Sequence, residues 1–254
     1  MIFLVRIIVN ADDFGYSKEH TLGVCKLHDD KFLSRTTIMV NMPDYDYAVN
    51  LAKESSIFSK TGLHLNITYG EPLTNEVKKF PGFCNAYGKF NAVFHKSTKG
   101  RLLIGKDASK ALEIEMRAQI EKYLSDGFTL MHMDSHRHIH TDYSIFRILE
   151  PLINEYSFQS LRISRNLPQN NRIDKRIYKK LVNTRIKNTA DTTDYFTDTI
   201  SFEKNISQIP DTASVEIMLH PILRENTGDY TDFDTYPMSR IYEVLSPFYD
   251  IIDR

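Results

Sequence analysis

The chain contains no tryptophan and only two cysteines among its 254 residues. Cys25 and Cys84 form no CxxC pair, so the sequence supports neither a disulfide framework nor a cysteine zinc site. No apolar run approaches the length of a membrane-spanning helix. The N-terminal apolar run (2–9) has no small-residue cleavage pattern after it, and we expect it to be a first strand rather than a signal peptide. A cytoplasmic protein without a membrane partner is therefore expected.

The chain also lacks an excess of either charge, because 32 basic residues nearly balance 33 acidic ones and the formal net charge is -1. This balance gives no general electrostatic case for nucleic acid as a partner. The one strong basic run (174–187) is interpreted as the solvated face of a helix. The GxGxxG, P-loop, GxSxG and HExxH motifs are absent, so nucleotide-dependent chemistry and serine hydrolysis lose support.

Short apolar runs alternate with amphipathic stretches along the chain. The apolar runs predict strands at 3–9, 36–40, 62–67, 128–133, 161–163 and 215–219. The amphipathic stretches predict helices at 17–30, from 44 onward, at 108–125 and at 143–156. This alternation predicts an α/β fold with a parallel sheet, and the number of units suits a (β/α) barrel. No linker or internal repeat is visible, so residues 1–254 are expected to form a single domain.

Residues 70–105 break this rhythm with prolines, glycines and five aromatic residues. A loop of this length inside a compact domain is usually functional. Its aromatic rings either stack on a sugar or anchor the loop on the core. We expect the loop to lie on the substrate side of the molecule.

Four of the nine histidines fall in one short segment, residues 132–140. The even positions of this segment hold His132, Asp134, His136, His138 and His140. In extended backbone these five side chains would share one face, and Arg137 would face away from them. A row of imidazoles with a carboxylate is rarely needed for packing, and it is typical of a metal site at the end of a strand.

Other reactive side chains lie on or just after the predicted strands. Functional groups of parallel α/β folds gather where the carboxyl ends of the strands meet. Asp12 and Asp13 end the first strand, and His64 lies in the third. One carboxylate and two imidazoles leave open positions on a divalent metal, so one aspartate, His64 and His136 are candidate ligands. The other aspartate could accept a proton from water, although both carboxylates could instead interact with the following helix.

The remaining candidates surround this set. His220 ends the last predicted strand, where it either protonates a leaving amine or caps the strand before Pro221. The other polar residues of the histidine-rich segment are expected to orient the ligands or to contact substrate, namely His132, Asp134, His138 and His140.

Several motifs occur in a fixed order along the chain. They are IVNADDFGYS (8–17), TTIMVN (36–41), GLHLNIT (62–68) with GEPL (70–73), HMDSHRHIH (132–140), LRISR (161–165) and MLHP (218–221). In these motifs the chain resembles the YdjC-like carbohydrate deacetylases, which include chitooligosaccharide deacetylase. The resemblance implies a distorted (β/α) barrel related to polysaccharide deacetylases. It also implies a metal-dependent hydrolase that removes N-acetyl groups from amino sugars or short N-acetylglucosamine oligosaccharides and releases acetate.

The same resemblance implies roles for individual residues. One divalent ion, magnesium or zinc with cobalt or manganese as alternatives, would be held by Asp13, His64 and His136. For catalysis the resemblance implies Asp12 as general base, His220 as general acid and Arg162 as the residue that orients the base. A homodimer is an expectation of the family alone.

One position departs from the family pattern, which often has a second histidine directly after the metal-binding one. This chain has Arg137 there. Because we expect Arg137 to face away from the metal row, the core chemistry should survive, while substrate or subunit contacts differ.

Two rival functions stay open. The His-x-His pairs at 136/138 and 138/140 also suit a metal-dependent amidohydrolase or phosphoesterase. In such barrels the pair usually lies on the first strand, which here ends in Asp12-Asp13. The second rival is a sugar-binding protein without turnover.

Overall fold

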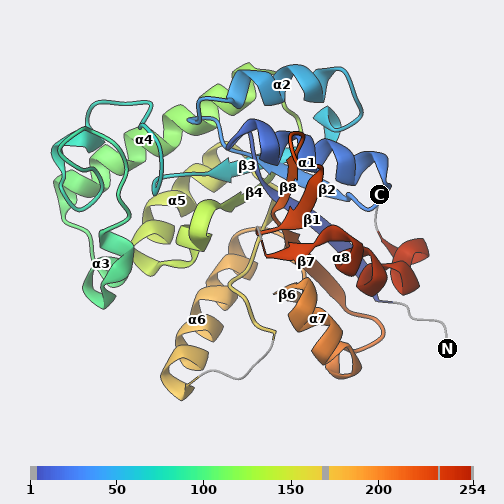
Figure 1. Cartoon of the computed structure of the whole chain (residues 1–254). Helices are drawn as coiled ribbons and strands as arrows, with labels where there is room; N and C mark the ends of the chain where they lie inside the picture. The colour runs from blue at the N-terminus through green and yellow to red at the C-terminus, as the bar shows by residue number, and fades with distance from the viewer. Residues whose placement is uncertain (1–4, 168–171, 234, 253–254) are drawn as a thin grey trace.

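The computed structural model describes residues 5–167, 172–233 and 235–252 (Figure 1). Its centre is a seven-stranded sheet with the strand order β5-β4-β3-β2-β1-β7-β6, and every neighbouring pair is parallel. The strands are β1 (Arg6–Phe14), β2 (Arg35–Ile38), β3 (Thr61–Leu65), β4 (His132–Ser135), β5 (Ser160–Leu161), β6 (Tyr195–Asp198) and β7 (Ser214–Leu219). The sheet curls into a half-barrel within a single domain, which confirms the predicted α/β fold.

Helices surround the strands, as Figure 1 shows. The α-helices are α1 (Lys18–Asp29), α2 (Tyr45–Lys53), α3 (Thr98–Leu102), α4 (Lys106–Ser125), α5 (Tyr143–Glu155), α6 (Ile173–Thr189), α7 (Thr199–Asn205) and α8 (Met238–Leu245). The 3-10 helices are η1 (Phe58–Lys60), η2 (Val77–Lys79), η3 (Phe94–Lys96), η4 (His136–Thr141), η5 (Ile206–Gln208) and η6 (Ser246–Ile251). Ser17 caps α1, as the sequence predicts, because its side chain accepts the His20 N–H.

Strand β1 lies inside the sheet, between β2 and β7, and is buried throughout except at Arg6. Parallel strands that are covered on both faces need such continuous apolar runs. The register places Ala11 beside Leu219 of β7, so His220 follows at the same edge as Asp12. Similarly, His64 of β3 lies beside Asp134 of β4. The predicted meeting of strand ends is therefore present.

The two outer strands of the sheet come close to closing the barrel. Ser160 in β5 forms an isolated parallel bridge with Asp191, just before β6. Further along, the Phe196 N–H of β6 donates to the Asn166 side chain at 2.9 Å. These contacts join the chain after β5 to the β6 edge without a full ladder, and the barrel is accordingly distorted.

The fourth strand begins and ends later than the sequence predicts. Strand β4 spans His132–Ser135 rather than 128–133. Beyond it, Arg137 and His138 have φ angles of 57° and 55°, so the chain turns into η4 instead of continuing extended. The strict alternation of side chains ends there. The prediction that the even residues of 132–140 share one face, with Arg137 on the other, is wrong beyond Ser135.

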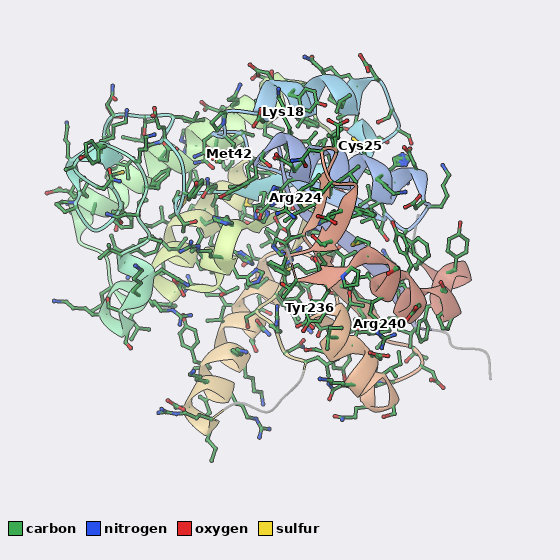
Figure 2. The ribbon with its side chains drawn as sticks, viewed as in Figure 1. Lys18, Cys25, Met42, Arg224, Tyr236 and Arg240 are labelled. Atoms are coloured by element: carbon green, nitrogen blue, oxygen red, sulfur yellow. The ribbon has the colours of Figure 1, made fainter. Side chains whose placement is uncertain are left out.

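A small antiparallel sheet, which the sequence did not reveal, follows β7. It consists of β8 (Pro221–Arg224), β9 (Asp229–Asp232) and β10 (Tyr236–Pro237). Strand β8 packs on α1, and Figure 2 shows Arg224 of β8 beside this helix. A Cβ added at Gly23 would lie 2.3 Å from the Pro221 carbonyl oxygen, so only glycine permits this approach. The contact fixes where the chain goes immediately after His220.

The long segment 70–105 is largely anchored on the core. Phe83, Phe90 and Phe94 are buried and belong to the apolar core, whereas Tyr87 is 88% exposed. Asp142 at the start of α5 accepts hydrogen bonds from the His95 ring at 2.5 Å and from Arg101 at 2.6 Å. The buried rings favour the anchoring interpretation over sugar stacking for these three phenylalanines.

The basic run forms part of α6, whose lysines and arginines are largely exposed, in keeping with the predicted solvated helix face. Among the described residues, no helix is long and apolar enough to cross a membrane.

Candidate active site

A cavity of about 510 Å³ opens at the carboxyl ends of the central strands. Its lining residues are Asp12, Asp13, Tyr16, His20, Tyr69, His136, Arg137, His138, Arg165, Met218, His220, Ile222 and Phe233. A larger cavity of about 590 Å³ lies along α6, but its lining contains neither carboxylate nor imidazole. The smaller cavity therefore carries the chemistry.

The two adjacent aspartates point to different partners because β1 is irregular at this point. Its register against β2 shifts between Ala11 and Phe14, and Asp13 has a φ of 63°. Left-handed backbone is uncommon for an aspartate, and such strain clusters at functional sites. As a result Asp12 contacts Arg162, while Asp13 contacts His64. The two adjacent carboxylates therefore lie in different surroundings, and their roles as metal ligand and base stay predictions.

Arg162 is the centre of a buried charge network. Its guanidinium donates to both oxygens of Asp12, at 2.5 and 2.6 Å. It also contacts Asp134 at 2.8 Å and Glu216 at 2.5 Å. Burial would raise the pKa of Asp12, but the Arg162 guanidinium outweighs burial and holds the pKa of this carboxyl well below its usual range. Asp12 is thus ionised and held in one orientation.

His64 lies between two carboxylates. Its Nδ1 is 2.6 Å from Asp134 Oδ1, and its Nε2 is 3.1 Å from Asp13 Oδ1. Burial opposes a charged imidazole, but the two carboxylates outweigh it and raise the pKa of His64 to about 10. In the absence of a cation, a proton on His64 therefore balances the two carboxylates. A divalent ion bound through Nε2 would displace that proton.

These atoms fit a metal ligand set. Asp13 Oδ1 and His64 Nε2 are buried, and neither has a hydrogen-bond partner among the described residues. Metal–ligand bonds of about 2.0–2.2 Å keep neighbouring ligand atoms roughly 3 Å apart, as these two are. The His136 ring lies with its centroid 6.1 Å from that of His64. Burial lowers the pKa of His136 to about 4, so its imidazole is neutral at pH 7, as a ligand must be.

Among the described residues, two groups other than Asp13, His64 and His136 meet a simple distance criterion for metal binding. Ligand atoms of Asp12, His64 and Asp134 lie within 4.8 Å of one another, and the same holds for His132, Asp134 and Glu216. A metal could therefore be held here. However, both sets include carboxylates that Arg162 already pairs. A nearby guanidinium repels a cation, which favours the Asp13 side of His64.

The other histidines of the histidine-rich segment occupy different surroundings. His140 is buried and does not line the cavity, and its Nε2 contacts the Arg162 carbonyl oxygen at 2.9 Å. His132 is buried as well and contacts Ser160 through Nδ1 at 2.9 Å. By contrast, His138 and Arg137 line the cavity. Burial lowers the pKa of His132 and His138 well below the usual value, and that of His140 to about 4.

His220 faces both aspartates from the end of β7. Its Nε2 lies 3.9 Å from Asp12 Oδ2 and 3.9 Å from Asp13 Oδ2. The backbone N–H of His220 donates to the Asp232 carboxylate at 2.6 Å. The Phe233 ring lies 3.6 Å from the His220 imidazole, centroid to centroid. Burial lowers the pKa of His220, although both aspartates oppose this. The backbone is thus held by Asp232, and the ring packs on Phe233 at the cavity and is neutral before reaction.

Sequence reasoning missed the aromatic wall of the cavity. Tyr16 stacks on Tyr69 with ring centroids 5.1 Å apart, and Tyr16 also lies 4.8 Å from the His20 ring. Tyr16 lies three residues after Asp13, within the IVNADDFGYS motif, so the motif itself offered the signal. Tyr69 and Phe233 gave none, because both lie in irregular connections.

Comparison with known proteins identifies the family of this chain. The family model described as YdjC-like protein matches residues 6–246. A protein named carbohydrate deacetylase from Brevibacillus brevis is 36% identical over 152 residues, covering 60% of this chain and 57% of that protein. The protein of the same name from Halalkalibacterium halodurans is 32% identical over 171 residues, covering 66% of this chain and 68% of its own.

One solved structure shares the fold. It is a protein from Enterococcus faecalis that is described as a cellobiose-phosphate cleavage protein, with a TM-score of 0.69 and 21% identity. The match covers 98% of this chain and 91% of that one. The chain therefore belongs to the YdjC-like protein family, as its motifs predict. The match to the first of the named relatives spans less than two thirds of that relative's length.

Proposed function

We propose that this protein is a metal-dependent hydrolase that removes N-acetyl groups from amino sugars or short N-acetylglucosamine oligosaccharides. The observation that carries the proposal is the buried pair of ligand atoms Asp13 Oδ1 and His64 Nε2, which lie 3.1 Å apart and have no other hydrogen-bond partner among the described residues, beside a base held by Arg162. The names of the relatives and the sugar-sized cavity support the same chemistry.

Asp13, His64 and His136 would hold the ion in this proposal. When bound, a divalent ion polarises the acetyl carbonyl and lowers the pKa of water. The three residues leave positions open on the ion, as a catalytic site requires. The identity of the metal stays a prediction, with magnesium or zinc first and cobalt or manganese as alternatives.

Asp12 would take the proton from the attacking water. Its carboxylate is ionised and oriented because Arg162 donates to both of its oxygens. Arg162 also lowers the pKa of Asp12, so the carboxylate is a weaker base but is held in a fixed position. His220 would then protonate the departing amine. Because His220 begins neutral, it must gain a proton during the cycle, and Asp12 lies 3.9 Å away.

Tyr16, Tyr69 and Phe233 would form the wall against which the sugar binds, since all three line the cavity. Flat aromatic faces suit the apolar face of a sugar ring. Arg137 lines the same cavity and would contact substrate directly.

The homodimer and the cytoplasmic location stay predictions. The substrate-side role of the segment 70–105 also stays a prediction, and among the described residues none from that segment lines the cavity.

The test is an acetate-release assay over N-acetylglucosamine, its oligomers and other acetylated sugars, run with several metals after chelation. Acetate from at least one amino sugar supports the proposal. Phosphate release from a panel of phosphomonoesters, without acetate, would favour the phosphoesterase alternative. Sugar binding in calorimetry without any product after long incubation would favour a binding protein.

A further inference from the structure

Two fully buried polar residues lie on α4, away from the cavity. Glu115 and Gln119 are both 0% exposed, one helical turn apart. Buried polar groups of this kind are costly unless they are hydrogen-bonded. Gln119 Nε2 donates to Glu115 Oε1 at 2.8 Å, which joins the two side chains. Their other hydrogen bonds go to the segment 66–74, which follows β3 and contains Tyr69 of the cavity wall.

Gln119 holds the backbone just beyond β3. Its Oε1 accepts the Asn66 N–H at 3.0 Å, and its Nε2 donates to the Asn66 carbonyl oxygen at 2.7 Å. Glu115 accepts the Leu73 N–H at 3.0 Å and the Thr74 N–H at 2.8 Å. Two side chains of one helix thus fix both ends of the segment 66–74, which contains Tyr69 of the cavity wall.

The Asn66 side chain continues the network inside that segment. Its Nδ2 donates to Asn41 Oδ1 at 2.9 Å and to the Tyr69 carbonyl oxygen at 2.8 Å. Its Oδ1 accepts the Thr68 and Tyr69 N–H groups, at 3.0 and 3.2 Å. These four contacts fix which end of the amide is oxygen. Asn66 Oδ1 is therefore an acceptor, and it receives the Thr68 hydroxyl at 3.2 Å.

This orientation has a consequence for His136. Thr68 Oγ1 lies 2.7 Å from His136 Nδ1. A threonine hydroxyl has only one hydrogen to donate. If that hydrogen goes to Asn66, the hydroxyl oxygen must accept from His136, so Nδ1 carries the proton. The neutral imidazole then has its free lone pair on Nε2.

We propose that Thr68 is a positioning residue: held by Asn66, it keeps the proton of His136 on Nδ1 and so leaves Nε2 free to bind a metal. The inference rests on the proposed function in that His136 is taken as a ligand. Asp134 likewise keeps a proton on His64 Nδ1, since a carboxylate can only accept from Nδ1 at 2.6 Å. Partners of this kind orient metal-bound imidazoles and strengthen the ligand.

Three substitutions test the proposal. Thr68→Val removes the hydroxyl at nearly constant volume, and Thr68→Ser restores it. Thr193→Val is the matched control, because the Thr193 hydroxyl is buried and has no hydrogen-bond partner among the described residues. Zn²⁺ affinity is measured by calorimetry on chelated protein. We expect Thr68→Val to bind Zn²⁺ about 10–100-fold more weakly, whereas Thr68→Ser and Thr193→Val stay within a few-fold of wild type.

The second readout is the tautomer of His136, from the ¹⁵N shifts and couplings of its ring in metal-free protein. The wild type should carry the proton on Nδ1, and Thr68→Val should show a mixture. Wild-type Zn²⁺ affinity in Thr68→Val, or a proton on Nε2 in the wild type, would overturn the proposal. A wild type that binds no divalent ion would overturn it too. Zn²⁺ binding without acetate release from any sugar would contradict the proposed function alone.

Discussion

His64 Nε2 and Asp13 Oδ1 lie 3.1 Å apart in the interior, and neither has a further hydrogen-bond partner among the described residues. Elsewhere in the site the buried carboxylates are engaged, because Arg162 pairs Asp12, Asp134 and Glu216. The Asp13–His64 pair is therefore where additional positive charge is best accommodated. The proposed metal site follows from this contrast.

Removing a proposed ligand should abolish metal binding. Asp13→Ala and His136→Ala each take one of three ligands, so we expect both variants to lose Zn²⁺ binding in calorimetry together with acetate release. His28→Ala serves as the control, because His28 lies far along α1 and contacts Ser56. Full acetate release by a folded Asp13→Ala or His136→Ala protein would refute the ligand assignment.

Arg162→Lys should change the pH dependence of the reaction. Lysine keeps one positive charge but loses the two-pronged contact with Asp12. Because Arg162 lowers the pKa of Asp12, weakening the contact should raise that pKa. The acidic limb of the kcat/KM profile should then move to higher pH, and kcat should fall about 10-fold or more. Arg185→Lys, which alters a surface pair with Glu150, is the control. An unchanged acidic limb would argue against Asp12 as the base.

Asp232 should make the protein less stable as pH rises. Burial raises the pKa of its carboxyl to about 7, although the His220 N–H opposes this. Below pH about 4 the group is protonated in the folded and the unfolded chain alike. Between about pH 4 and 7 only the unfolded chain loses the proton, so the free energy of unfolding falls by about 1.4 kcal/mol per pH unit.

Asp232→Asn removes this titration and keeps an oxygen that can accept the His220 N–H. We therefore expect the Tm of the variant to exceed that of the wild type by more at pH 8 than at pH 5. Thermal melts at the two pH values measure the difference. Equal gaps at both would show that Asp232 does not titrate in this range.

Gly23→Ala should disturb His220 without touching the metal ligands. The new Cβ would meet the Pro221 carbonyl oxygen at 2.3 Å, and backbone on both sides must move. We expect a loss of about 1–3 kcal/mol in stability and a lower kcat, with Zn²⁺ affinity unchanged. Gly82→Ala is the matched control, since nothing lies within 4 Å of its added Cβ. A variant with wild-type Tm and kcat would mean that β8 does not position His220.

Much of the site could be predicted because parallel strands bring their carboxyl ends together. Asp12, Asp13, His64 and His220 each lie on or just after an apolar run. The sheet places Asp12, Asp13 and His220 around one cavity and His64 in contact with Asp13. The turn after Ser135 could not be predicted. Its left-handed residues are Arg137 and an adjacent histidine rather than glycine, so no residue type marks it.

The burial of Glu115 and Gln119 on α4 also escaped prediction, for a physical reason. The helical spacing of Leu112, Met116 and Ile120 predicts the apolar face of α4 correctly, and all three are buried. Glu115 and Gln119 look like solvent-facing residues of the same helix, yet both are buried because the chain beyond β3 satisfies them. Contacts between segments far apart in sequence bury these two residues, and the periodicity of a helix does not indicate such contacts.

The central claim is that a divalent ion held by Asp13, His64 and His136 is required to release acetate from an N-acetylated sugar. The most direct measurement follows acetate from N-acetylglucosamine oligomers with chelated protein, before and after adding back single metals. The account predicts no acetate from the chelated protein and recovery with at least one of zinc, magnesium, cobalt or manganese. Undiminished acetate release after complete metal removal would contradict it.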